Sequence, residues 1–262
     1  SMRALFFTLL LLSPLFLFAQ DPASCGTTSE DQYFIREKMF QNRVRISPED
    51  IERIQNQRFT IYIPTVIHIV GDSAGNAVAD PDGALGMMCR LNDDFADQNL
   101  QFYIKDSIHY LYDNIVNADA YDSISIDRMI AAKDTTVLNI FINGSAGGGV
   151  AGYYSRRGDF VFILNPYAQY GSTTITHELG HFFTLPHTFY GWEGQNAPTL
   201  YGSGPAPDSV DNGHDEKIEV EYFARSGVNA NCYSSADGFC DTDADYYSFR
   251  LDCPNIFQVQ DP

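Results

Sequence analysis

The sequence is short of positive charge. Of its 262 residues, 16 are lysine or arginine and 34 are aspartate or glutamate, giving a formal net charge of −18. The acidic excess lies after Arg58, because residues 1–58 hold seven basic and seven acidic residues. Nucleic acids and anionic membranes are held by Lys and Arg, so neither is an expected partner. The excess favours calcium and cationic substrates, or it serves solubility alone.

The sequence also lacks an apolar run long enough to cross a bilayer. Its longest run, residues 5–18, has about 14 residues, whereas a membrane-spanning helix needs roughly 20. Arg3 before the run and Ala19-Gln20 after it are typical of a secretory signal peptide. We therefore expect residues 1–20 to be a signal peptide and the protein to be secreted without a stable membrane anchor. A lipid-modified Cys25 is the alternative.

Cysteine pairs spaced for a zinc ribbon are missing too. Secretion places the cysteines in an oxidising compartment, where disulfides form, and an odd number leaves at least one thiol unpaired. Cys89 falls on the apolar stripe of a helix expected over residues 81–98, which predicts a buried free thiol. The last three cysteines could staple a long loop. The five are Cys25, Cys89, Cys232, Cys240 and Cys253.

What the sequence does contain is a stretch with metal-ligand spacing. His177 and His181 are four residues apart, so on a helix they share a face and can reach one zinc ion. Glu178 can reach a water beside the metal and act as general base, then as general acid towards the leaving amine. Pro186 ends the helix, and the exit can bring His187 back as a third ligand. Three protein ligands with an open fourth position are typical of catalytic zinc.

The stretch from His177 to His187 resembles the extended zinc motif of the metzincins, H-E-x-x-H-x-x-G-x-x-H. Residues 171–173 and 238–243 narrow the resemblance to the pappalysin family, especially its secreted, ulilysin-like bacterial members. It extends over about residues 25–255. It implies a zinc-dependent endopeptidase with a zincin fold and a preference for a basic residue just after the scissile bond. Thr184 stands where the family has Gly, so the turn there differs or is strained.

The resemblance also assigns a role to Cys25-Gly26-Thr27. This tripeptide resembles the start of the family's pro-segments, in which the cysteine blocks the zinc as a fourth ligand. The implied organisation is a signal peptide over 1–20, a pro-segment over 21–58 and a catalytic domain over 59–262, made as a latent zymogen. The alternative is a disulfide from Cys25 to one of the three late cysteines. Cleavage points in the pro-segment are Arg36, Lys38, Arg43, Arg45, Arg53 and Arg58.

Aspartates cluster around Gly238. Carboxylates at this density suit a calcium ion held by loop oxygens, although the spacing is not that of an EF-hand. The resemblance implies a structural calcium in the same region. The expected ligands are Asp237, Asp241, Asp243 and Asp245.

The remaining pattern predicts strands alternating with helices, and therefore an α/β fold with a twisted mixed sheet and an active-site helix. His68 lies inside an apolar strand and is expected to be packed there. In the metzincin pattern residues 150–154 form an edge strand above the cleft, where Gly152 and Tyr153 would pair with a substrate peptide. The strands are expected over 59–70, 100–104, 136–143, 150–154 and 160–164, and the helices over 81–98 and 123–132.

One family feature is missing. Metzincins carry a methionine turn after the third histidine, but the last methionine here is Met129. Either the C-terminal subdomain is truncated and loop-rich, or the chain is a degenerate homologue.

Taken together, the signal peptide and the histidine motif predict a secreted zinc endopeptidase. The alternative functions are an inactive secreted zinc-binding module and a metal-free adhesion domain.

Overall fold

The computed structural model describes most of the chain outside its two ends. The expected signal peptide lies outside the described residues, as do Asp243, Asp245 and Cys253. Of the helices that are described, none combines the length and apolarity needed to cross a bilayer. The described ranges are 24–56, 59–76, 79–192, 209–211, 217–222, 226–227 and 230–241.

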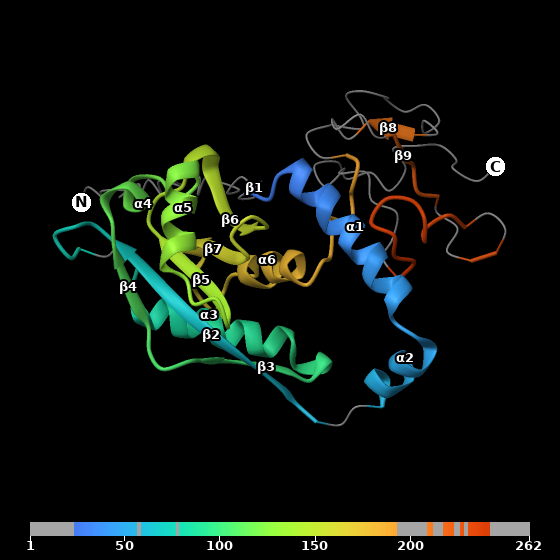
Figure 1. The fold of residues 1–262 in the computed structure, drawn as a ribbon, viewed down its shortest axis with the longest axis horizontal. Helices are drawn as coiled ribbons and strands as arrows, with labels where there is room; N and C mark the ends of the chain where they lie inside the picture. Colours follow the sequence, from blue (N-terminus) through green and yellow to red (C-terminus); the bar gives the residue numbers. More distant parts are fainter. Residues whose placement is uncertain are drawn as a thin grey trace, which may run out of the picture.

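A seven-stranded sheet lies at the centre of the described residues (Figure 1). Strand β6 runs antiparallel to β7, and every other pair is parallel. The expected α/β fold with a twisted mixed sheet is thus confirmed. In spatial order the strands are β1 (Ser24–Cys25), β6 (Val150–Ser155), β7 (Phe160–Leu164), β5 (Leu138–Asn143), β2 (Ile61–Gly71) and β3 (Leu100–Ile104), with β4 (His109–Tyr112) also paired to β2. A separate antiparallel pair is formed by β8 (Ser209–Asp211) and β9 (Lys217–Glu219).

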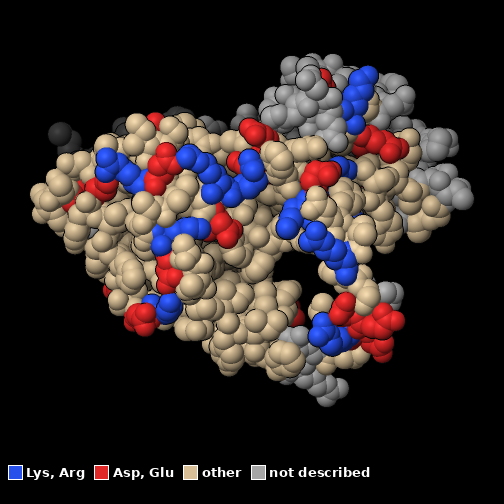
Figure 2. Space-filling model, in the orientation of Figure 1, with Lys and Arg blue, Asp and Glu red and all other residues tan. Residues whose placement is uncertain are grey.

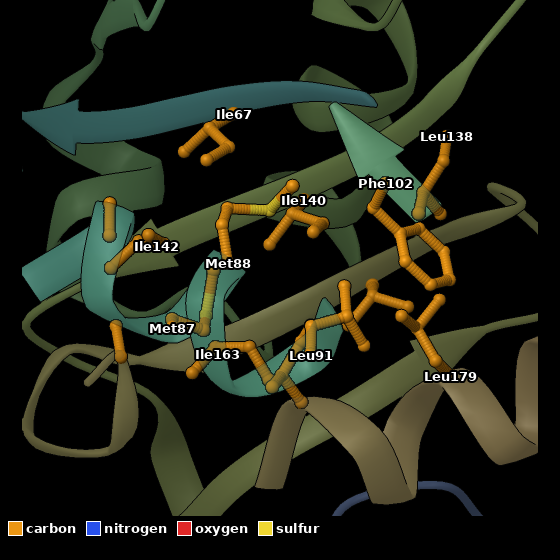
Figure 3. Packing of buried hydrophobic residues seen from close by; sticks show 14 of the residues in the cluster. Ile67, Met87, Met88, Leu91, Phe102, Leu138, Ile140, Ile142, Ile163 and Leu179 are labelled. Atoms are coloured by element: carbon orange, nitrogen blue, oxygen red, sulfur yellow. The ribbon is translucent and has the colours of Figure 1, made fainter. Parts of the chain in front are cut away.

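Helices cover both faces of the sheet. Because strand side chains alternate, Ile140 and Ile142 pack towards α3 (Pro81–Asp94) and α6 (Thr174–Phe182), while Phe141 packs towards α4 (Asn114–Ala118) and α5 (Ser123–Ala132). Figure 3 shows Met87 and Leu91 of α3 and Leu179 of α6 meeting the strand side chains. Burial on both faces explains why β5 is a nearly continuous apolar run. Single 3₁₀ turns lie at Ala96–Gln98, Gly147–Gly149 and Asn165–Tyr167.

The core fixes the rotation of α6 about its axis. Ile175 and Leu179 are fully buried, and burial of such side chains contributes roughly 1.5–3 kcal/mol each. With 3.6 residues per turn, this apolar face puts His177 and His181 on the opposite side of the helix. The core therefore aims both imidazoles away from the sheet.

The main departure from the sequence prediction is α1 (Ser29–Arg45), a 17-residue helix in the expected pro-segment. The Thr28 side chain caps it by accepting from the backbone N–H of Asp31. Figure 1 shows α1 crossing between the sheet domain and the segment that contains residues 230–241. A capping box at Ser47 opens the next helix, α2 (Pro48–Gln55).

Two predictions about packed side chains have opposite outcomes. His68 is buried in β2, with its Nε2 2.9 Å from Asn139 Oδ1 and its ring stacked on Phe141, as expected. Cys89 is exposed, so the prediction of a buried thiol is wrong. The buried stripe of α3 runs through Ala84, Met87, Met88 and Leu91, and the helical rotation places Cys89 off that stripe.

The late cysteines are partly accounted for. Cys232 and Cys240 form a disulfide, and Cys25 is free. The alternative in which Cys25 pairs with either of these two is therefore wrong. Cys253, the remaining candidate, lies outside the described residues.

Candidate metal centre

Helix α6, the chain after it and strand β1 bring three histidines and one cysteine together. His181 Nε2 lies 3.2 Å from His177 Nε2 and 3.5 Å from Cys25 Sγ. The rings of His181 and His187 are 4.7 Å apart between centroids. One ligand atom from each of the four side chains lies within 4.8 Å of all the others. Within the described ranges, this is the group of side chains close enough to share an ion.

The spacing of these atoms fits tetrahedral zinc. Bonds of about 2.0–2.1 Å to nitrogen and about 2.3 Å to sulfur imply separations of about 3.3 Å between two nitrogens and about 3.6 Å between nitrogen and sulfur. The observed 3.2 and 3.5 Å agree with both. Imidazole and thiolate are also ligands that zinc accepts readily. The donor set therefore fits a zinc ion.

A backbone contact orients the central histidine. His181 Nδ1 lies 2.8 Å from the carbonyl oxygen of Leu185. When Nδ1 donates its hydrogen there, Nε2 keeps a lone pair directed into the cluster, which is the usual second contact of a metal-binding histidine. Burial lowers the pKa of His181 well below its ordinary value and that of His177 to about 4, with the His187 charge adding to both. Of these two imidazoles, His181 is buried and His177 is exposed.

Thr184 occupies the left-handed region of backbone space, with φ 70°. The N–H groups of Thr184 and Leu185 donate to the carbonyls of His181 and Gly180, which is the pattern of a Schellman helix end. Such an end needs a positive φ at the position of Thr184, and that is why Gly suits it. The turn towards His187 is thus kept, and the β-branched residue adds strain of roughly 1–2 kcal/mol.

Replacing Thr184 with glycine should therefore stabilise the zinc-loaded protein. Relief of strain outweighs the added freedom of the unfolded chain, so we expect about 1 kcal/mol and a rise in melting temperature of about 2–4 °C. The matched control is Thr173→Gly at the other end of α6, where φ is −96° and no strain is relieved, so stability should fall. Equal losses in the two variants would show that Thr184 is unstrained.

Glu178 is buried beside the cluster rather than within it. Its Oε2 accepts a hydrogen bond of 3.3 Å from the Thr27 hydroxyl and lies 3.7 Å from Cys25 Sγ. Burial raises the pKa of Glu178 to about 8, against the opposing effect of hydrogen bonds from Cys25 and Thr27. Burial, and then the charge of Glu178, also raise the pKa of Cys25 well above that of a free thiol. The Cys25 thiol would therefore lose its proton here only when it binds a metal ion.

Strand β1 lies along β6 directly above the cluster. The N–H of Gly26 donates to the carbonyl of Gly152 over 2.8 Å, and the N–H of Tyr154 donates to Thr27 Oγ1 over 3.1 Å. A Cβ on Gly152 would lie 3.0 Å from Glu178 Cγ, so a residue without a side chain lets the strand pass this close. Tyr153 is buried, and its hydroxyl donates to the Ala120 carbonyl. Its side chain therefore packs into the domain, and the β6 backbone groups that bond to residues 24–27 are those of Gly152 and Tyr154.

Two residues of α1 reach the site and its surroundings, although the sequence pattern assigned neither of them a role there. Gln32 is fully buried, with its amide nitrogen 3.2 Å from His181 Nε2 and its Oε1 accepting from the N–H of His187. Arg36 donates to the carbonyls of Ser234 and Ala236 over 2.9 and 2.7 Å. The available signal was the spacing of the buried residues Gln32, Ile35, Arg36 and Met39, which is helical although two of the four are polar.

The expected calcium site is only partly described. Asp237 is buried, and its Oδ1 accepts from the N–H of Phe239, whereas Asp241 is exposed. Within the described ranges, these two aspartates belong to no group of three or more side chains that could hold a metal ion. The calcium site stays a prediction.

Distant relatives of the chain are extracellular metalloproteases. The chain is 27% identical over 151 residues to an "Extracellular metalloprotease" of Colletotrichum graminicola and 31% identical over 173 residues to one of Pyricularia oryzae. These alignments cover 50% and 58% of this chain, and 53% and 59% of the relatives. The chain thus spans little more than half the length of the curated relatives it matches. No protein-family model matches the chain.

Solved structures are similar over part of the chain, as one example shows. It is metalloproteinase-II from Bacteroides fragilis, with 14% sequence identity, 61% of each chain covered and a TM-score of 0.31. That score is below the level at which two folds can be equated.

Proposed function

We propose that the chain carries the catalytic centre of a secreted zinc-dependent metalloendopeptidase of the pappalysin type, described in its latent form. The observation that carries the proposal is the set of three imidazoles and one thiol at zinc spacing, with the buried carboxylate of Glu178 beside it. The names of the fungal relatives support an extracellular metalloprotease. Residues 1–20 would direct secretion. Cleavage of a quenched peptide library by the zinc-loaded, activated protein tests the function.

His177, His181 and His187 would hold the zinc. Bound zinc supplies Lewis acidity, which polarises a peptide carbonyl and makes a neighbouring water more acidic. Glu178 lies outside the ligand set, so it can accept the proton of the attacking water and return it to the leaving amine. The backbone of β6 at Gly152 and Tyr154 would align an extended peptide by strand addition once β1 is gone.

Residues 24–45 would keep this centre latent. Cys25 occupies the fourth ligand position, and Thr27 holds both Glu178 and the N–H of Tyr154. Strand β1 takes the edge of β6, and Gln32 fills the space beside His181. Metal, base and substrate strand are thus covered by one continuous segment, which is the arrangement expected of a pro-segment.

The complete set of four protein ligands also favours a second candidate, a zinc-binding module without catalysis. Structural zinc sites are closed by four protein ligands, as this one would be with Cys25 in place. A buried carboxylate has no purpose in such a site, because a buried group with a raised pKa destabilises the fold. The behaviour of a Cys25 variant separates the two candidates.

Arg36 supports the proposed preference for a basic substrate residue. Its guanidinium donates to two backbone carbonyls and lies 4.9 Å from the centre of the Tyr190 ring. The domain wall next to α1 can therefore hold a guanidinium group. A substrate arginine could take this place after the pro-segment leaves.

Limited digestion of the precursor with trypsin should cut first at Arg45. Arg36 is 7% exposed, so cleavage there would first require α1 to come away from the domain. Arg45 ends α1 beside Val44, which is 89% exposed, and Figure 2 shows a gap between the α2 end of this segment and the domain body. Cleavage needs local opening, which costs least where little is buried. N-terminal sequencing of early fragments checks this, and first cleavage at Arg36 would contradict the docking of α1.

We propose that the aspartates around Gly238 bind a structural calcium ion. Calcium that binds only the folded protein stabilises it by mass action, about 2.7 kcal/mol at one hundred times the dissociation constant. We expect the melting temperature to rise on titration with calcium and to fall with a calcium-selective chelator. Asp241→Asn should weaken this response, whereas Asp97→Asn in the exposed turn Ala96–Gln98 should not. Melting that is unchanged through millimolar calcium would rule the site out.

A further inference from the structure

Arg156 lies one residue beyond β6, and its charged partners come from α1. Its Nε donates to Asp31 Oδ1 over 2.8 Å, and its Nη2 lies 3.8 Å from Glu30 Oε1. Its guanidinium also lies 4.0 Å from the centre of the Phe34 ring. Within the described residues, Arg156 has no ion pair with the body of the domain. Removal of α1 would thus leave this cation without a counter-charge.

The next residue gives the contrast. Arg157 is paired with Asp127 of α5, which belongs to the domain body. Departure of α1 would leave that pair intact. The domain after Arg58 is strongly acidic. Without its α1 partners, Arg156 would therefore place a positive charge at the cleft of a negatively charged domain.

Arg156 also shares a cavity with the metal centre. A cavity of about 320 Å³ lies between α1 and the domain. Its domain wall is formed by Tyr154, Arg156, His181 and Thr184, and its other wall belongs to α1. Once α1 leaves, Arg156 faces the same open space as the ligand His181.

Strand geometry sets the distance between Arg156 and the scissile bond. Cys25 pairs with Gly152 above the cluster, and Arg156 is four residues further along the chain. At about 3.3 Å per residue this is about 13 Å, which an extended peptide beside β6 covers in about four residues. We propose that Arg156 is a specificity-determining residue that binds an aspartate or glutamate side chain of the substrate, three to four residues from the scissile bond. This inference rests on the proposed function.

The contacts of α1 show the chemistry of the subsite. In the latent protein Asp31 fills it with a carboxylate, and Glu30 adds a second acid nearby. The Nε–H and one terminal amine of a guanidinium can together engage a planar carboxylate, which a lysine cannot do. An acidic substrate residue would repeat this contact. The alternative, that Arg156 only anchors α1, predicts no substrate preference at all.

Peptide binding tests the subsite without needing turnover. The zinc-loaded Glu178→Gln protein is freed of residues 24–45 by limited proteolysis and titrated with peptides that carry Asp, Asn or Lys at one position, three or four residues on either side of the scissile bond. We expect Asp to bind about two- to fivefold more tightly than Asn, in the range of exposed ion pairs, with less difference at high salt. Arg156→Gln should remove the preference, and Arg156→Glu should shift it to Lys. Arg157→Gln is the matched control and should keep it.

Two outcomes would overturn the subsite. One is equal binding of the Asp and Asn peptides at all four positions, and the other is a preference that survives Arg156→Gln. Cleavage of the same peptides by the protein with Glu178 intact tests the proposed function separately. Uniform cleavage with no acidic preference would overturn the subsite alone. An Arg156-dependent preference in binding without any cleavage would overturn the function and leave the subsite standing.

Discussion

Replacing Glu178 with glutamine should leave zinc bound and lower peptide cleavage by about a hundred- to ten-thousandfold. Glutamine keeps the size of the side chain and can still accept the hydrogen bond from Thr27, but it cannot take a proton from water. Glu178 contacts Cys25 and Thr27 and is not a member of the ligand group, so zinc content should stay near one per chain. Steady-state kinetics of the activated protein and metal analysis measure the two effects.

Two further variants make this result specific. His181→Ala removes the ligand that lies closest to both His177 and Cys25, so zinc and activity should be lost together. Asp97→Asn changes an exposed carboxylate that is not a member of the ligand group and should alter neither. Normal cleavage by Glu178→Gln would show that the base is another group. Loss of zinc in that variant would show that Glu178 helps to hold the metal.

The cluster of three histidines could be predicted because its information is local. His177 and His181 are one helical turn apart, and Pro186 sets a limit to the helix, which the structure ends earlier, at Phe182. The apolar face of α6, with Ile175 and Leu179, fixes the direction of both imidazoles. Helix periodicity and a single proline therefore determine most of the geometry within about a dozen residues of sequence.

The contacts that α1 makes with the site could not be predicted in the same way. Gln32 and His181 are separated by 149 residues, and Arg36 and Ala236 by 200, so no local spacing relates them. The buried face of α1 also includes Gln32 and Arg36, whose polarity hides the amphipathic pattern. Polar side chains are buried there because histidines and backbone carbonyls of distant segments satisfy them. Only the tertiary structure shows these partners.

Thr184 lies between these two cases. The sequence showed that the residue departs from the motif and offered either a different turn or a strained one. The structure has the same left-handed turn, with a threonine in it. Tertiary contacts of His181 and His187 with α1 hold the turn in place against the local preference of threonine. The motif identified Thr184 as the unusual position, and contacts from distant residues determined the conformation of its turn.

Replacing Cys25 with alanine should remove latency. In the structure Cys25 Sγ lies 3.5 Å from His181 Nε2, where a thiolate would complete the ligand set and exclude water from the fourth position. If about 0.1–10% of precursor molecules have the cleft open at equilibrium, removal of the Cys25 thiol raises activity about tenfold to a thousandfold. We expect the variant to cleave peptides without activation and to process its own segment near Arg45.

Zinc spectroscopy distinguishes this release from simple loss of structure. X-ray absorption of the precursor should show one sulfur ligand, and that of Cys25→Ala should show none while zinc is retained by the three histidines. Cys89→Ala, which removes the exposed thiol of α3, is the matched control and should stay latent with its sulfur ligand unchanged. A Cys25→Ala protein that loses zinc and remains inactive would instead identify a structural site closed by four protein ligands. A variant that keeps zinc and stays as latent as the precursor would show that Thr27, Gln32 and β1 are sufficient to close the cleft without the thiol.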